Sequence, residues 1–103
     1  MAEKAAIKAA AQKRFTATVG VLTSIKSAMR DPDSLKWQDI RANDDGSVVC
    51  VVYRARNGFG GMNLEHASFA GKSISTSDAS WNKHCANKSL YEMGHAKFAS
   101  SLT

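Results

Sequence analysis

The stretch from Arg30 to Met62 constrains the fold most, because it holds a helix stop and a hairpin turn beside an apolar run. Pro32 cannot continue a helix and holds Asp31 in extended geometry, so Asp31 can cap a short turn with Pro32 at its first position. Asn43–Gly46 consists of residues that tolerate positive φ and hydrogen-bond their own backbone, as hairpin turns require. Val48–Tyr53 is apolar on both faces, which predicts a central, covered strand.

Helical patterns lie on both sides of this region. Residues 3–30 begin with alanine, the best helix former, and carry one apolar stripe at three- and four-residue steps. That stripe consists of Phe15, Val19, Leu22, Ile25 and Met29. Ser75–Asp78 is an N-cap cluster, and the helix that it opens carries Trp81 and Cys85 one turn apart. A final helix is expected to carry Tyr91, His95, Phe98 and Leu102.

These elements predict one α+β domain over residues 1–103, an ordinary length for a single domain. A long N-terminal helix is assigned to 1–30, a three- to four-stranded antiparallel meander to 36–76, and a C-terminal helical segment that packs on the sheet to 77–103. The terminal helices are expected to cover one sheet face. The expected core residues are Leu22, Trp37, Val49, Val51 and Trp81.

Charge and hydropathy limit the partners and the compartment. The formal net charge of +5 favours anionic partners, which are an acidic protein surface, nucleic acid or a membrane surface. No segment approaches the roughly 20 apolar residues of a membrane span, and no signal peptide is evident. As written, the chain is expected in the cytoplasm of a host cell, or in the periplasm or outside the cell if a signal peptide was removed.

No residue pattern predicts catalysis, a cofactor or a metal. The Gly58–Gly61 loop lacks the Lys-Ser/Thr of a phosphate loop and leads to a strand, so its glycines serve a turn. A nucleophilic Cys50 is disfavoured because a thiol within an apolar strand is inert. A zinc site is disfavoured because the candidate ligands offer no closely spaced pair apart from two adjacent residues. Those candidates are Cys50, His66, His84, Cys85 and His95.

The expected binding groups are basic side chains at two places and one aromatic residue. They are Lys4 and Lys8 on the first helix, Arg54 and Arg56 at the end of a strand, and Phe59 in the glycine turn. Arg54 and Arg56 share one strand face and Tyr53 lies on the other. Base stacking and phosphate contact would therefore not converge, which makes nucleic acid the less favoured partner.

The two cysteines are expected to face the same layer. Cys50 lies in the middle of a strand, and Cys85 lies on a helix that should cover the same sheet. A bridge between them would close a loop of about 35 residues and stabilise by roughly 3–4 kcal/mol. Whether it forms depends on the compartment, because a cytosolic thiol pool keeps such pairs reduced.

Four segments together carry a family resemblance: Asp31–Ser34, Val49-Cys50, Asn57–Gly61, and Trp81 with Cys85. Over roughly residues 28 to 86 they resemble a group of small, mostly uncharacterised bacterial and phage proteins. Val51 stands where that group usually has glycine, and Met62 where it usually has tyrosine. Many members look secreted or lipid-anchored, so the resemblance implies a disulfide between the two cysteines. It implies no reaction.

The sequence therefore predicts a small non-enzymatic bacterial or phage protein that binds a macromolecular partner. An analogy of size and origin suggests a phage-encoded inhibitor of a bacterial defence complex, acting on an acidic protein surface. The alternatives are a nucleic-acid-binding accessory protein and a secreted or periplasmic disulfide-containing protein.

Overall fold

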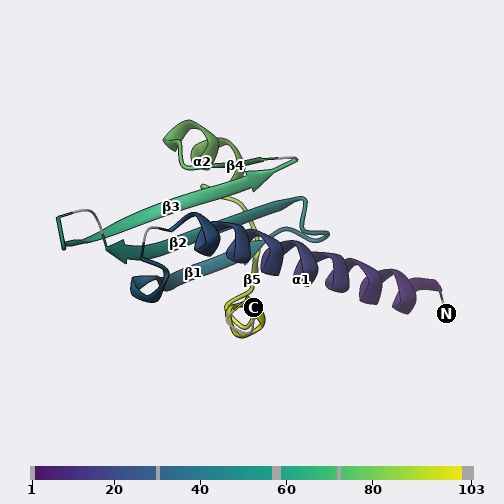
Figure 1. Cartoon of the computed structure of the whole chain (residues 1–103). Helices are drawn as coiled ribbons and strands as arrows, with labels where there is room; N and C mark the ends of the chain where they lie inside the picture. The colour runs from purple at the N-terminus through teal and green to yellow at the C-terminus, as the bar shows by residue number, and fades with distance from the viewer. Residues whose placement is uncertain (1, 30, 57–58, 72, 101–103) are drawn as a thin grey trace.

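A long helix lies across one face of a five-stranded antiparallel sheet (Figure 1). The structure is a computed structural model that describes residues 2–29, 31–56, 59–71 and 73–100. Its elements are α1 (Ala2–Ala28), the 3-10 turn η1 (Pro32–Ser34), β1 (Lys36–Ala42), β2 (Val48–Arg56), β3 (Met62–Ala70), β4 (Ser73–Ser75), α2 (Asp78–His84), β5 (Tyr91–Glu92) and α3 (Ala96–Ser100). The strand order is β4-β3-β2-β1-β5, so the predicted meander is present and gains a fifth strand.

The core lies between α1 and the sheet. In β2 alternate residues face α1, and Val49 and Val51 are fully buried there beside Leu22. These three residues confirm the predicted core. Trp37 is only half-buried at its margin and contacts Tyr53 edge-on, with ring centroids 6.0 Å apart. The predicted strands and the apolar stripe of α1 therefore meet as expected.

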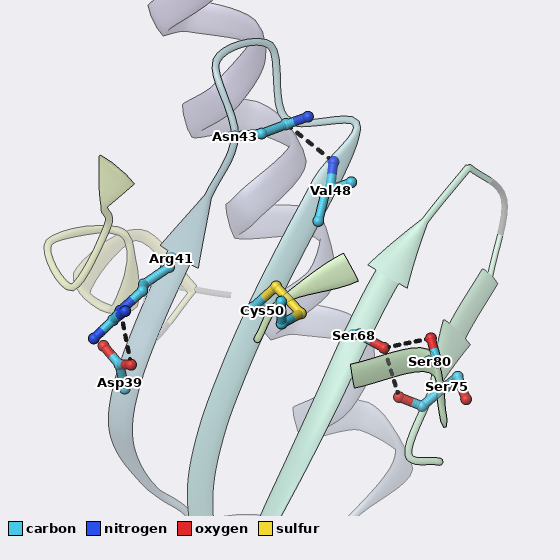
Figure 2. Close-up of a disulfide and its surroundings, with 9 residues drawn as sticks. Asp39, Arg41, Asn43, Val48, Cys50, Ser68, Ser75 and Ser80 are labelled. Atoms are coloured by element: carbon cyan, nitrogen blue, oxygen red, sulfur yellow. Dashed lines mark hydrogen bonds and ion pairs between the residues drawn. A yellow bond between two sulfur atoms is a disulfide. The ribbon is translucent and has the colours of Figure 1, made fainter. Parts of the chain in front are cut away.

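The β1–β2 hairpin turns where the sequence predicted it. The Asn43 side-chain oxygen accepts a hydrogen bond from the Val48 N–H at 3.0 Å (Figure 2). The Gly46 N–H donates to the Asn43 carbonyl at 3.3 Å. Gly46 has φ +78°, and the Arg14 guanidinium donates to the Asp44 carbonyl at 2.8 Å. The turn is therefore held against α1.

The helix α2 lies on the sheet face opposite to α1, whereas α3 packs on the α1 side, where Ala96 belongs to the same core as Leu22. The expectation that the terminal helices share one face therefore holds for α3 and is wrong for α2. Cys50 points away from Val49 and Val51, and it is bonded to Cys85 with their Cα atoms 6.0 Å apart. Figure 2 shows the disulfide in front of the strands and α1 behind them. The predicted approach of the cysteines is confirmed. Trp81 belongs to this second layer, 5.0 Å from the His66 ring, and is not a residue of the α1 core.

The predicted final helix over Tyr91–Leu102 is wrong in its first half. Tyr91 and Glu92 form β5, opposite Ala42 and Arg41 of β1, and the Met93 N–H donates to the Ile40 carbonyl at 2.7 Å. Pairing with a strand far away in the sequence overrides the local helical spacing. Only Ala96–Ser100 is helical, and Leu102 lies outside the described residues.

Candidate functional site

Within the described residues, much of the sheet face that carries α2 is left uncovered, at the end of the sheet next to the β2–β3 turn. The helix α2 covers the stretch around Cys50, His66 and Ser68, through the disulfide and through the hydrogen bonds that join His66 to Asp78 and Ser68 to Ser80. Further along, the strands place exposed side chains side by side, because Lys36 pairs with Arg54, Arg54 with Leu64, and Arg56 with Met62. We call Lys36, Arg54, Arg56, Met62 and Leu64 the open face.

The open face combines positive charge with exposed apolar surface. Met62 is 42% exposed and Leu64 59% exposed. Arg56 lies 3.5 Å from the Asp31 carboxylate, whereas no ion pair joins Lys36 or Arg54 within the described parts of the chain. On β1, the Arg41 guanidinium contacts Asp39 at 2.9 Å, so those charges cancel (Figure 2). Three cations against one carboxylate leave the open face positive.

The turn η1 fixes the end of β2 that carries Arg56. The Arg56 N–H donates to the Ser34 hydroxyl at 3.0 Å, and that hydroxyl donates to the Asp31 carbonyl at 2.8 Å. The Asp31 side chain makes no capping hydrogen bond, contrary to expectation, and contacts the Arg56 guanidinium instead. The Asp31–Ser34 segment therefore anchors the open face.

The predicted binding residues do not form one surface. Arg54 and Arg56 lie on the open face, and Phe59 is fully exposed in the adjoining turn. Lys8 is exposed on α1, whose beginning lies at the opposite end of the molecule from the β2–β3 turn (Figure 1). The side chain of Lys4 lies outside the described part. Sequence reasoning missed Lys36, Met62 and Leu64, because only the strand register places them beside the arginines.

Tyr53 lies beneath the open face, on the α1 side of β2, and is 5% exposed. Burial raises the pKa of its phenol, and the nearby Glu65 carboxylate raises that pKa further. Glu65 is the strand neighbour of Tyr53 and so belongs to the same side of the sheet. Its charge therefore does not neutralise the open face.

The polar cluster under α2 holds that helix in place. His66 Nε2 lies 2.8 Å from the Asp78 carboxylate. The Ser68 hydroxyl contacts the Ser80 hydroxyl at 2.7 Å and the Ser75 carbonyl at 3.5 Å (Figure 2). Ser77 caps the helix, accepting from the Ser80 N–H as predicted. The serine hydroxyls thus serve packing between β3, β4 and α2.

Four of the five histidine and cysteine candidates for a metal site contact other groups, and the fifth, His84, lies half-buried at the end of α2. Cys50 and Cys85 are bonded to each other, His66 contacts Asp78, and His95 stacks on Phe15 with ring centroids 5.7 Å apart. Within the described ranges, no three His, Cys, Asp or Glu side chains lie close enough to hold a metal ion. In the same ranges, no helix has the length and apolar character needed to cross a bilayer.

The fold and the open face define a small disulfide-linked α+β domain with a basic sheet surface. No protein-family model, curated protein or solved structure matches the chain.

Proposed function

We propose that the protein is a non-enzymatic binding module whose open face holds an acidic surface of a partner protein. The observation that carries this proposal is the row of Lys36, Arg54 and Arg56 beside exposed Met62 and Leu64. Arginine and exposed apolar side chains are the groups that protein interfaces use, with arginine pairing to carboxylates in a fork.

An acidic protein is favoured over nucleic acid by the position of the aromatic residues. Single-stranded nucleic acid needs aromatic faces beside the cations. Tyr53 is buried on the opposite side of the sheet, and Trp37 is half-buried against the α1 core. Phe59 is the one aromatic side chain in the turn beside the open face.

The disulfide supports a periplasmic or secreted setting for this binding. Such bonds persist in oxidising compartments and are rare in the cytosol. Cys50 is 3% exposed and Cys85 8% exposed, so the bond is enclosed by the fold. An inhibitor of a bacterial protein complex would use the open face in the same way, if its target is reached outside the reducing cytosol.

The test is capture of a partner by the oxidised protein from nuclease-treated bacterial envelope extract. The wild type is compared with Arg54→Glu/Arg56→Glu, and Lys83→Glu/Lys88→Glu serves as the control with the same change of charge. Lys83 and Lys88 are exposed and lie outside the open face. We expect the arginine variant to lose the captured protein and the lysine variant to keep it.

Two outcomes would contradict the proposal. Capture that survives the arginine variant would show that the open face is not the binding surface. Capture that disappears after nuclease treatment, with a steep loss of affinity between low and moderate salt, would favour nucleic acid instead.

A further inference from the structure

The outer edge of β3 is only partly covered. The strand β4 has three residues and pairs with Ser68, Phe69 and Ala70 of β3. Beyond that point, Leu64–Ala67 has no strand on its outer side within the described chain, and Figure 1 shows β3 continuing past β4 towards the β2–β3 turn. A row of unpaired main-chain groups at a sheet edge is a template for another strand.

An apolar groove lies between α1 and the strands β3 and β4, and it reaches the uncovered edge of β3 at Ala67, beside Thr76. It consists of two cavities of about 350 and 460 Å³ that share Ser24 and Ile74. Ala67 and Tyr53 form its floor beside Ile25, while α1 contributes small residues along it, among them Gly20 and Ala28. A Cβ atom placed on Gly20 would meet nothing within 4 Å. The groove thus has room for side chains from outside.

We propose that the partner adds an extended strand to the Leu64–Ala67 edge, with acidic side chains alternating with apolar ones. This rests on the proposed function, whose partner it describes. Side chains of a strand alternate between faces, so one set would lie on the α1 side, where it reaches the groove at Ala67, and the other would lie beside Leu64. Arg54 is next to Leu64 on β2. It would then be two strand spacings, roughly 10 Å, from the added strand, which long arginine and glutamate side chains together span.

The edge and the charges both favour this occupant over others. A helix could fill the groove but would leave the main-chain groups of the edge unpaired, at a cost in free energy. A second copy of the chain would bring another Arg54 and Arg56 to the same seam, and like charges repel. An acidic strand satisfies the main-chain groups and neutralises the arginines.

The test uses a fluorescein-labelled peptide of four Glu-Val repeats, with fluorescence anisotropy as the measurement. Two versions carry N-methyl groups, either on every valine or on every glutamate. A fourth peptide has the same composition with the glutamates grouped at one end. Only one set of strand amides can face β3, so we expect methylation of that set to weaken binding at least about tenfold and methylation of the other to change little. The grouped peptide should bind at least about tenfold more weakly than the alternating one.

The protein side of the test uses Ala28→Trp, which fills the groove from an exposed position, with its melting temperature as the check on folding. Ser24→Trp is a second groove variant. Both variants should bind the alternating peptide more weakly than the wild type does. In the wild type, hydrogen exchange should show new protection of amides within Leu64–Ala67 when the peptide binds.

The two proposals can fail separately. If all four peptides bind with the same affinity and Arg54→Glu/Arg56→Glu lowers the affinity for each of them, the open face binds acidic chains without strand addition. If the alternating peptide protects the β3 amides but binds Arg54→Glu/Arg56→Glu as tightly as the wild type, the charge proposal fails and strand addition stands. If the alternating peptide does not bind, or binds without protecting those amides, strand addition is overturned.

Discussion

Gly46 shows how one residue joins two elements. Its φ of +78° is a conformation that favours glycine, and a Cβ atom there would lie 2.7 Å from the Cβ of Ala17 on α1. The turn can therefore lie against the helix only if this position has no side chain. This contact sets the distance between α1 and the β1–β2 hairpin.

We expect Gly46→Ala to destabilise the protein more than Gly71→Ala. Gly71 has nearly the same φ, +75°, but a Cβ there would meet nothing within 4 Å. The backbone strain is thus common to both variants. The difference between their losses in the free energy of unfolding therefore measures the contact with α1. That difference should be about 1–3 kcal/mol, as overpacking usually costs. Urea unfolding of both variants measures it, and equal losses would show that the contact is unimportant.

Tyr53 makes the stability sensitive to alkaline pH. Its pKa in the folded protein is raised above the ordinary value of 10.0, by burial first and by Glu65 second. Its contribution to the free energy of unfolding is therefore complete below about pH 10 and is lost as the pH rises through the raised pKa. Tyr53→Phe should flatten the decline of stability in that range. Tyr91→Phe, at a 51% exposed position, is the control and should leave the decline unchanged.

Single residues also show what the sequence can predict of the site. The period of two along β2 predicts that Arg54 and Arg56 share a face, and the structure has them there. It cannot place Met62 and Leu64 beside them, because that depends on which residue of β3 pairs with which residue of β2.

At the scale of elements, local signals predicted the structure where the chain contacts its sequence neighbours. The turn Asn43–Gly46 and the Ser77 cap depend on hydrogen bonds within a few residues, and both are present. The strand β5 depends on pairing with Arg41 and Ala42, some fifty residues away, so its two residues resembled a helix. The sequence also could not predict on which face of the sheet α2 packs, because no local pattern distinguishes the two faces.

The turn η1 supports β2 through one hydroxyl group. Ser34→Ala would leave the Arg56 N–H without its acceptor, and we expect a loss of about 1–3 kcal/mol. Asp31→Asn removes only an exposed ion pair and should cost at most about 1 kcal/mol. Chemical denaturation of the two variants compares them. A loss for Asp31→Asn as large as that for Ser34→Ala would mean that the ion pair, not the hydroxyl, holds the turn.

At the scale of the whole molecule, the disulfide joins the sheet to the layer that α1 does not cover. It links Cys50 of β2 to Cys85 at the end of α2, across 35 residues. The helix α2 has seven residues and none of them is buried, so packing alone holds it weakly. The bond therefore keeps the second layer in place.

Reduction of the disulfide should lower the free energy of unfolding by about 3–4 kcal/mol, the value for a loop of this length. The measurement is guanidinium unfolding with and without dithiothreitol, and Cys50→Ala/Cys85→Ala should reproduce the reduced protein. Its control is the double variant itself, which should not respond to the reductant. An unchanged midpoint for the wild type would show that the bond adds nothing to stability.

The same bond determines how the chain would respond to mechanical force. A pull applied at the two termini passes through the covalent link, so the segment between Cys50 and Cys85 carries no tension. That ring contains β3, β4 and the β2–β3 turn. The oxidised chain should extend roughly 110–120 Å less than the reduced chain when fully stretched, since each residue spans at most about 3.3–3.6 Å. The edge proposed to receive a partner strand would thus remain inside a closed loop while the rest of the chain is drawn out.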